Sequence, residues 1–410
     1  MARILVAGGS LGGLTAANLL ARAGHEVQVI EKAAGSMDGR GAGIVTHTAL
    51  VDALRRCGLP EGEALGVAIP GRITLDVQAG VLGEMALPQV LTSWSRLYHL
   101  LRGLLPAGVA YRQGVTLESV AQDAQGVRAA TSAGTLEADL LIAADGIRSA
   151  VRQQLWPDVQ PQYAGYVAWR GLTDEAVLSE GTRALVFERF GFCLPPAEQL
   201  IGYPVAGAGN RTEPGHRAWN FVWYRGAPAP LRLAELLTDA DGVHYPLGIP
   251  PHRVNWREVA HMREAARRLL APAFAEIIEK CAQPFLQPIF DVVSDQLAQG
   301  RVALLGDAAF VARPHVGMGV TKAMQDAVAL AEAIAAHGAS PGALAAYEAA
   351  RLGPGREVAE RARRLGAYMQ SCGQGASPLA RDARTVMAET AIDLDLPSPQ
   401  AGARPATIPA

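Results

Sequence analysis

Hydrophobic and polar positions along the first part of the chain follow a pattern that predicts a strand, a helix and a second strand. Residues 3–7 are an apolar run, a glycine-rich turn follows, and apolar side chains recur at helical spacing over residues 14–23. Residues 26–30 form a second run rich in valine and isoleucine. These three segments predict a βαβ unit, and therefore a parallel sheet at the start of the chain.

Further along the chain the apolar pattern changes twice. Residues 160–230 contain short alternating segments with many aromatic side chains, which predicts a mostly antiparallel sheet. Helical periodicity then returns, before a strand that ends at Gly306-Asp307. The pattern as a whole adds helices at residues 48–56, 95–105, 258–281 and 319–337, and strands at residues 139–144 and 301–305. We therefore expect an α/β fold whose parallel sheet is assembled from three separated pieces of chain.

Composition limits the kind of protein. Half of the 410 residues are hydrophobic and 19% are charged, which is typical of a globular protein with a large core. The net charge of -2 leaves no excess of basic residues for a phosphate backbone or an anionic membrane, so we expect neither as a partner. No apolar run reaches the roughly 18 residues of a membrane span, and glycines interrupt the N-terminal apolar segment, unlike a signal peptide.

Cysteine spacing points to a reducing compartment. The four cysteines, at positions 57, 193, 281 and 372, are far apart and form no pattern that suits a metal or a redox pair. We therefore expect a cytoplasmic protein without a bound metal.

The first motif with chemical meaning is the glycine-rich turn, Gly8-Gly9-Ser10-Leu11-Gly12-Gly13, with Glu31 at the end of the next strand. Glycines at such a turn let a pyrophosphate approach the N-terminus of the following helix, and the acid accepts hydrogen bonds from ribose hydroxyls. Ser10 replaces the middle glycine of the usual pattern, and a purely structural turn is the alternative. Because strand, helix and acid are all in register, the motif favours dinucleotide binding.

Two later motifs also follow predicted strands. Asp145-Gly146 lies in the segment 143–149, and Gly306-Asp307 precedes residues 314–319 and a helix that carries Asp326. With three motifs in this order, the chain resembles the FAD-dependent aromatic hydroxylases of the para-hydroxybenzoate hydroxylase superfamily. The resemblance implies FAD as the cofactor. It also implies NADH or NADPH as a transient cosubstrate, since the chain has no second glycine motif.

The resemblance implies a set of FAD-binding residues. Asp307 is expected to accept hydroxyl hydrogen bonds, with helix capping as its alternative, and Asp145 either touches the cofactor or caps the next helix. Arg96 is expected near the cofactor unless it is a solvated helix charge. The amides that begin the helix at Gly319 can stabilise negative charge on a reduced flavin ring. The full set is Gly8, Ser10, Leu11, Gly12, Glu31, Lys32, Arg40, Gly43, Arg96, Asp145, Asp307, Pro314, Gly317 and Gly319.

The expected organisation is a Rossmann-like FAD-binding domain with an inserted, mostly antiparallel substrate domain and a C-terminal helix. The FAD-binding domain is predicted to be discontinuous, and residues 371–410 are predicted to be a loosely ordered tail rich in Ala, Pro and Ser. The predicted boundaries are 1–72, 96–158 and 285–370 for the FAD-binding domain, and 73–95 and 159–284 for the substrate domain.

The resemblance also implies a reaction: NAD(P)H reduces FAD, O2 adds to give a C4a-hydroperoxide, and its distal oxygen is transferred to a hydroxylated ring. The protein would hold the ring, exclude water and favour the ionised substrate. Four segments look like the 2,6-dihydroxypyridine 3-hydroxylase branch, although relatives acting on other hydroxylated rings share them. These segments are residues 163–171, 201–205, 220–224 and 313–315. A homodimer would be ordinary for the superfamily.

Three residues are candidates for a catalytic role. His47 is expected to have a pKa suited to accepting a phenolic proton near neutrality, or else simply to start a helix. Tyr203 either bonds a ring substituent or packs in the core. His315, like Arg313, either orients the substrate or caps a helix. The stripe of Trp219, Phe221 and Trp223 at period two is more typical of a core than of an aromatic cage.

Other functions remain open at this level. A flavin halogenase on the same fold is disfavoured, because Trp219 and Trp223 are not spaced as in a W-x-W-x-I-P segment. A flavoprotein that oxidises or reduces its ligand without inserting oxygen is a second alternative. A flavin-binding sensor without enzymatic activity is the most remote one.

Overall fold

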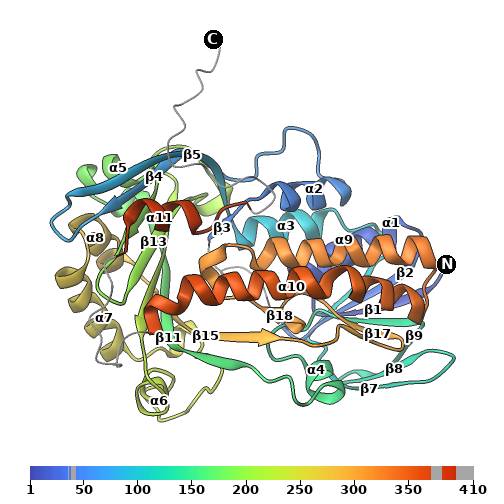
Figure 1. Cartoon of the computed structure of the whole chain (residues 1–410). Helices are drawn as coiled ribbons and strands as arrows, with labels where there is room; N and C mark the ends of the chain where they lie inside the picture. The colour runs from blue at the N-terminus through green and yellow to red at the C-terminus, as the bar shows by residue number, and fades with distance from the viewer. Residues whose placement is uncertain (36, 38–42, 371–380, 394–410) are drawn as a thin grey trace.

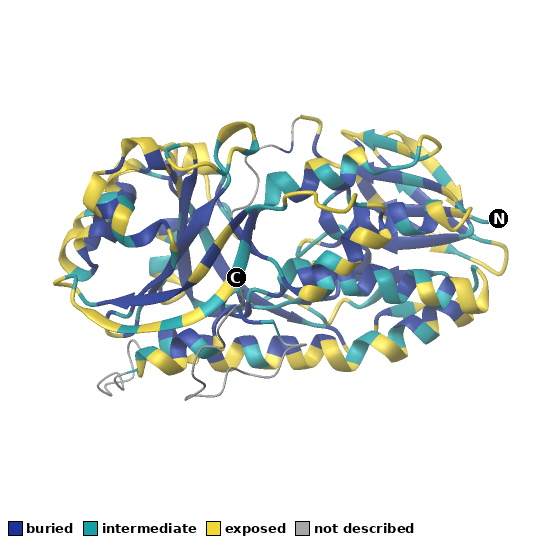
Figure 2. Cartoon of the chain, turned by 90° about the horizontal axis from the view of Figure 1, so that it is seen from above, coloured by how far each residue is buried: buried dark blue, intermediate teal, exposed yellow. Residues whose placement is uncertain are grey.

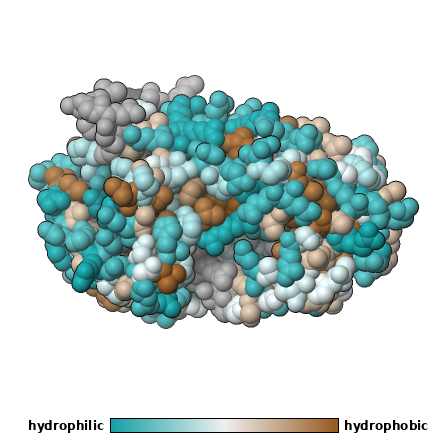
Figure 3. Space-filling view, turned by 90° about the horizontal axis from the view of Figure 1, so that it is seen from below, coloured by the Kyte–Doolittle hydropathy of each residue, from teal (hydrophilic) through white to brown (hydrophobic). Residues whose placement is uncertain are grey.

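The computed structural model describes residues 1–35, 37, 43–370 and 381–393. Figure 1 shows two sheet-containing halves side by side, with the long helix α10 (Pro341–Gln370) running along both. The strands at the centre of each half are buried, and the outer faces of the surrounding helices are exposed (Figure 2). From below, hydrophilic residues cover most of the surface and apolar residues form small separate patches (Figure 3).

The first half is built on a six-stranded sheet in the order β16-β17-β10-β1-β2-β6. Every neighbouring pair is parallel except β16 and β17. Its central strands are apolar on both faces, as expected for a parallel sheet covered by helices. This confirms the expectation of a parallel sheet drawn from separated pieces of chain. The strands are β1 Arg3–Ala7, β2 Glu26–Glu31, β6 Ala110–Gln113, β10 Leu140–Ala143, β16 Ala298–Gln299 and β17 Val302–Leu304.

Helices and a small sheet cover this first half. α1 packs against α9, which packs in turn against α10. The small antiparallel sheet consists of β7 Leu117–Gln122, β8 Val127–Thr131 and β9 Gly134–Ala138. The helices of this half, besides α10, are α1 Leu11–Arg22, α2 Thr48–Arg56, α3 Trp94–Gly103, α4 Ala150–Leu155 and α9 Gly319–His337.

The second half is built on a nine-stranded sheet in the order β18-β15-β11-β14-β13-β12-β4-β5-β3. All neighbouring pairs are antiparallel except β12 and β4. The mostly antiparallel character agrees with the sequence. Its strands are β3 Gly43–Val45, β4 Val67–Leu75, β5 Val81–Ser93, β11 Gln162–Asp174, β12 Arg189–Cys193, β13 Gln199–Val205, β14 Ala218–Gly226, β15 Phe285–Val293 and β18 Phe310–Val311.

The strands of this large sheet do not follow the predicted domain boundaries. β15 lies in the stretch expected with the cofactor-binding part but pairs with β11, and the boundary predicted at residue 72 falls inside β4. β3 also joins this sheet through β5. The pairing of distant strands depends on register, which the period-two pattern of one strand does not contain.

One face of the large sheet packs on helices and forms a core. Trp219, Phe221 and Trp223 on β14 are fully buried in this core, so the aromatic stripe is a packing feature, as predicted. The helical stretch predicted at residues 258–281 is interrupted, because Leu270 is extended and Pro272 begins a new helix. The helices of this half are α5 Glu180–Val186, α6 Leu231–Leu236, α7 Trp256–Leu269 and α8 Pro272–Lys280.

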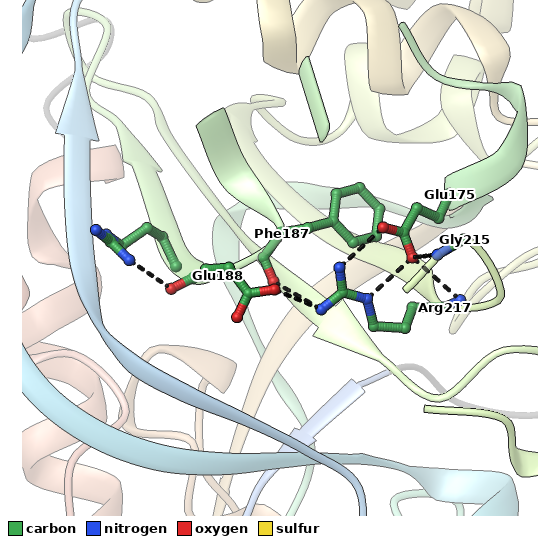
Figure 4. A network of polar contacts seen from close by, with 6 residues as sticks. Glu175, Phe187, Glu188, Gly215 and Arg217 are labelled. Atoms are coloured by element: carbon green, nitrogen blue, oxygen red, sulfur yellow. Dashed lines mark hydrogen bonds and ion pairs between the residues drawn. The ribbon is translucent and has the colours of Figure 1, made fainter. Parts of the chain in front are cut away.

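A buried ion-pair network holds the start of β14 (Figure 4). Arg217 donates to both carboxylate oxygens of Glu175, at 2.9 and 2.8 Å, and to Glu188 at 2.7 Å. The guanidinium also donates to the carbonyl of Phe187. A buried arginine is tolerated here because its donors meet acceptors and its charge is compensated. The network is structural and lies at the start of the strand that carries the aromatic stripe.

The predicted loose tail is corrected for residues 381–393. This segment contains α11 (Ala383–Glu389), lies beside β4 and β5, and buries Val386, Met387 and Ile392. Its apolar positions are too few to form a visible periodicity, and they pack on strands about 300 residues earlier in the chain. The rest of the predicted tail, residues 371–380 and 394–410, lies outside the described residues.

Candidate active site

The glycine turn after β1 is shaped by the close approach of two strands. Gly8 has φ +113°, and a Cβ there would collide with the carbonyl oxygen of Ala144 at the end of β10. Only glycine adopts this conformation at this distance without strain. Gly12 packs on Leu305 and Ala323, while Leu11 is buried and contributes only its backbone to the turn. The turn therefore aims the N-terminus of α1 at the carboxyl edge of the parallel sheet.

A cavity of about 380 Å³ lies at this edge and brings five of the predicted cofactor residues together: Gly8, Ser10, Glu31, Lys32 and Asp145. The carboxylate of Glu31 is fixed by the backbone N–H groups of Gly9, at 2.9 Å, and Ala33, at 2.8 Å. Each carboxylate oxygen can accept a further hydrogen bond. The cavity thus combines a helix N-terminus with an oriented acid, which suits a dinucleotide.

Asp145 uses one carboxylate oxygen in a described hydrogen bond and leaves the other unpaired. Its Oδ2 accepts the N–H of Ala150 at 2.8 Å, which is the expected capping contact. Its Oδ1 is buried and has no partner among the described residues, and burial raises the pKa of this carboxyl group. A buried acceptor without a donor is unfavourable. A hydroxyl of a bound ligand would satisfy it.

Charged residues hold the Gly306-Asp307 turn after β17, and of these residues the sequence analysis named Asp326 only. Lys322 is fully buried, and its ammonium donates to the carbonyl of Gly306 at 3.0 Å. Asp326 accepts from the N–H of Gly306 at 3.2 Å and from Arg351 at 2.7 Å. The side chain of Asp307 is exposed and makes no capping bond in its short helix, Gly306–Ala308. Its carboxylate is therefore available to a ligand.

Pro314, Gly317 and Gly319 lie in the loop that leads into α9. Pro314 begins a short helix, Pro314–Val316, and Gly317 follows in the left-handed region with φ +67°. Gly319 is the first residue of α9, and a Cβ there would have no described heavy atom within 4 Å. Open space in front of a helix N-terminus suits an anionic, planar group.

The structure places Arg96 at the start of α3. It pairs with Glu63 and donates to the carbonyl of Ala64 at 2.9 Å. Its neighbour Trp94 lines the 380 Å³ cavity, whereas Arg96 lines a different one. Arg40 lies outside the described residues.

His47 precedes α2 and is buried. Its Nδ1 lies 2.7 Å from Oγ1 of Thr321 in α9, and its Nε2 is buried with no partner among the described residues. Burial lowers the pKa of His47 to about 4, so the near-neutral pKa expected from the sequence is wrong. His47 does start a helix, as the alternative expected, because it occupies the N-cap position of α2, but its imidazole makes no capping bond. His47 is a neutral group with one nitrogen available.

Polar side chains gather on the face of the large sheet that lies opposite the aromatic stripe. Tyr203 of β13 is directly opposite Asn220 of β14, and both contact Gly43 of β3. Asn220 accepts the N–H of Gly43 at 3.0 Å, but its Nδ2 has no partner among the described residues. The hydroxyl of Tyr224 and the Nε of Arg170 are likewise buried without a described partner. These four residues, called the polar cluster here, join three neighbouring strands: Arg170, Tyr203, Asn220 and Tyr224.

His315 links this cluster to the loop before α9. Its Nε2 lies 2.8 Å from the hydroxyl of Tyr166, and its ring centroid is 4.0 Å from that of Tyr224. Burial holds the pKa of His315 well below its ordinary value, and Nδ1 has no partner among the described residues. Arg313 is committed elsewhere, because its guanidinium pairs with Asp291 of β15 at 2.8 Å. His315 therefore faces the cluster, and Arg313 anchors the loop.

Sequence reasoning named Tyr203 but gave no role to Arg170, Asn220 or Tyr224. A signal was present: on β14, residues 220, 222 and 224 alternate with the apolar aromatic stripe and so must point to the other face. Polar residues on the inner face of a buried strand are unusual and indicate a binding site. No such signal exists for Lys322, whose burial depends on the packing of α9 and α10.

Comparison with known families decides the identity of the fold. A model described as "FAD binding domain" matches residues 1–179 and 250–362, and one described as "FAD binding domain-like" matches residues 163–291. The chain belongs to the FAD binding domain family. It is an FAD-dependent aromatic monooxygenase of the para-hydroxybenzoate hydroxylase type, as the motifs predicted.

Several relatives match over most of their length. A 2,6-dihydroxypyridine 3-monooxygenase of Paenarthrobacter nicotinovorans is 31% identical over 90% of this chain and 92% of its own. A 3-amino-4-hydroxybenzoate 2-monooxygenase of Streptomyces cremeus is 32% identical over 88% and 86%. The solved structure of 2,6-dihydroxypyridine-3-hydroxylase from Arthrobacter nicotinovorans has a TM-score of 0.86 and 30% identity, and the match covers 97% of this chain and 98% of that one.

The described residues of this monooxygenase fit FAD. The unpartnered Oδ1 of Asp145 and the exposed carboxylate of Asp307 offer acceptors, and no described heavy atom lies within 4 Å of the position that a Cβ on Gly319 would take. Within the described ranges, no group of three or more His, Cys, Asp or Glu side chains is placed to hold a metal ion. In the same part of the chain, no helix has the length and apolarity that crossing a membrane requires.

Proposed function

We propose that this monooxygenase uses NADH or NADPH and O2 to hydroxylate a small ring that already carries hydroxyl groups, such as 2,6-dihydroxypyridine. Similarity to the 2,6-dihydroxypyridine enzymes over nearly the whole chain supports this substrate class. The 3-amino-4-hydroxybenzoate relative is about equally similar, which keeps other phenolic rings within the proposal.

One observation carries the proposal. Three hydrogen-bonding groups, Arg170 Nε, Asn220 Nδ2 and the Tyr224 hydroxyl, are buried without a described partner on one face of the sheet. Groups left unpaired in a protein interior are unfavourable unless a ligand pairs with them. Nitrogen donors of this kind match the oxygens on a hydroxylated ring. A guanidinium beside them favours the ionised oxygen.

Ionisation matters because it makes the ring carbon richer in electrons. When bound, FAD would supply the reducing equivalents taken from NAD(P)H and the activation of O2. The residues of the chain bind the ring, orient it and keep water away. The N-terminal amides of α9 would stabilise negative charge on the cofactor.

The two histidines have a limited part in this scheme. Both imidazoles are buried and neutral, so neither adds a positive charge to the site near pH 7. His47 Nε2 can accept a hydrogen bond from a ring hydroxyl if Nδ1 carries the proton. We propose that the ionised substrate is favoured mainly by the donors of the polar cluster, and less by His47 acting as a base.

Flavin reduction tests the proposal. FAD-loaded protein is mixed with NADH or NADPH in a stopped-flow instrument, with and without 2,6-dihydroxypyridine and simple phenols, and flavin absorbance is followed. The proposal expects faster reduction with the right ring, and a loss of that acceleration in Asn220→Leu. Reduction that no ring accelerates would contradict it and favour a flavoprotein that does not insert oxygen. Flavin that stays oxidised throughout would favour a sensor.

A further inference from the structure

The described C-terminal residues 381–393, called the strap here, reach back across the chain to both histidine-bearing loops. The strap consists of residues 381 and 382, α11 and the four residues that follow it, and it lies beside β4 and β5 (Figure 1). Arg361 of α10 donates to the carbonyl of Glu389 at 3.1 Å. Other polar contacts of the strap bridge more than 300 positions of sequence.

Arg72 of β4 anchors the strap. This arginine is fully buried and donates to the carbonyls of Met387, Thr390 at 2.6 Å and Ala391 at 2.9 Å. These carbonyls belong to the end of α11, where helix carbonyls lack internal partners and the helix dipole is negative. The guanidinium also lies over the ring of Phe190, 4.8 Å from its centroid. The anchor fixes the position at which the chain leaves α11.

Beyond the anchor, the strap supports the loop that carries His315. The N–H of Ala391 donates to the carbonyl of His315 at 3.0 Å. A Cβ placed on Gly317 would lie 2.8 Å from the Cβ of Ala391, so the two backbones are in close contact. Ala391 has φ +49°, a conformation that an L-residue adopts only when its contacts hold it there. Ala391 is thus pressed against the loop that enters α9.

The end of the strap caps the helix that begins beside His47. Asp393 accepts both the N–H and the hydroxyl of Thr48, each at 2.7 Å. This is the N-terminal cap of α2, and His47 occupies the capping position without using its own side chain. The imidazole is therefore left to bond Thr321 with Nδ1 and to keep Nε2 available.

A cavity of about 530 Å³ adjoins these contacts. Its wall includes His47 on one side and Ile392 and Asp393 of the strap on another. The strap is therefore part of the immediate surroundings of His47.

We infer that the strap completes the active centre, with Arg72 and Asp393 acting as positioning residues for His47 and for the loop of His315. The inference rests on the proposed function for its kinetic part. Its structural part stands on the contacts alone, because displacement of the strap would release the first turn of α2 and residues 315–317 together.

Variants of Asp393 test the inference, since this residue is the last one of the strap and lies outside the hydrophobic core. In FAD-loaded protein, Asp393→Ala removes the cap, Asp393→Asn retains a capping side chain, and Asn255→Ala removes a cap from the distant helix α7. Two readouts are needed. Hydrogen exchange by mass spectrometry reports on residues 48–51 and 315–320, and steady-state kinetics report kcat, KM and the ratio of product to peroxide.

The inference expects Asp393→Ala to lower kcat about 10-fold with a smaller change in KM, because misplacement of reacting groups slows chemistry more than binding. Exchange in both segments rises, peroxide increases relative to product, and Asp393→Asn recovers most of each effect. Asn255→Ala lowers the melting temperature without these changes. Unchanged exchange in Asp393→Ala, or kinetic losses that Asn255→Ala reproduces, would overturn it.

Failure of the proposed function would look different. If the parent protein hydroxylated no ring, the exchange experiment would still decide the structural part. Faster exchange confined to residues 48–51 and 315–320 in Asp393→Ala would then support positioning by the strap. Exchange equal to that of the parent would overturn it.

Discussion

Tyr166 and His315 are joined by a 2.8 Å hydrogen bond that connects the large sheet to the loop leading into α9. Because burial keeps His315 neutral, its two nitrogens must divide into one donor and one acceptor. If the tyrosine hydroxyl donates to Nε2, Nδ1 carries the proton and is a donor. The ring of His315 lies 4.0 Å from that of Tyr224 in the polar cluster. The hydrogen bond therefore sets what His315 offers to a ligand.

Tyr166→Phe should lower kcat for the ring substrate by about 10-fold, because loss of this bond lets the imidazole change tautomer and orientation. FAD affinity should be unaffected. Tyr163→Phe is the matched control, since Tyr163 lies on the same strand as Tyr166 and its hydroxyl donates to the carbonyl of Ala227. Steady-state kinetics and FAD titration of both variants check this. Equal kinetic effects in the two variants would count against a specific role for His315.

Gly319→Ala and Gly317→Ala should separate cofactor binding from folding. At Gly319 a methyl group has open space in the protein alone, so we expect unchanged apoprotein stability and FAD binding weakened about 10-fold by contact with the ring. At Gly317 the positive φ and the contact with Ala391 should lower the free energy of unfolding by about 1–2 kcal/mol. Urea unfolding of the apoproteins and FAD titration distinguish the two. Normal FAD affinity in Gly319→Ala would place the flavin ring elsewhere.

Tyr224→Phe should weaken substrate binding without destabilising the protein. The hydroxyl is buried with no partner among the described residues, so its removal leaves the free energy of unfolding equal or slightly higher. KM for the ring should rise about 10-fold as one hydrogen bond is lost. Tyr347→Phe provides the contrast, because its hydroxyl donates to Leu304 at 2.8 Å and its loss should cost about 1 kcal/mol of stability. A Tyr224→Phe variant with unchanged KM would remove this residue from the site.

Acid should destabilise the protein through His47. The pKa of His47 falls from 6.5 in the unfolded chain to about 4 in the native protein, so only the unfolded state gains a proton between these values. The contribution of His47 to the free energy of unfolding is fully present above pH 6.5. Below that pH it falls by about 1.4 kcal/mol per pH unit. Burial also lowers the pKa of His315, so this residue likewise lowers the free energy of unfolding in acid. Urea unfolding at pH 7 and pH 5 should show a smaller loss for His47→Gln than for the parent, and equal losses would contradict the burial argument.

Local patterns predicted much of this fold because the relevant physics is local. The βαβ opening, the strand before Gly306 and the aromatic stripe on β14 depend on periodicity and turn chemistry within a few residues. The pairing of β15 with β11 and the docking of α11 were not predictable in this way. Both depend on which distant surfaces meet, and neither leaves a periodic signature in its own segment.

The residues of the candidate site also fall into two groups, those that local sequence could predict and those that it could not. Gly8 and Glu31 were named because a phosphate-binding turn demands particular residues at a particular spacing, whereas Asp145 was named from the resemblance. The structure places all three at one cavity. Lys322 and Arg72 were missed because their roles arise from burial beside carbonyl groups contributed by remote elements. The low pKa of His47 belongs to this second class, since desolvation is a property of the packed fold.

Oxygen isotope incorporation tests the central claim most directly. FAD-loaded protein is incubated with NADH or NADPH and 18-oxygen gas, with 2,6-dihydroxypyridine beside simple phenols, and products are analysed by mass spectrometry. The account predicts one labelled oxygen atom in a ring product. Labelled peroxide without any labelled ring, or product oxygen that comes from water, would contradict it.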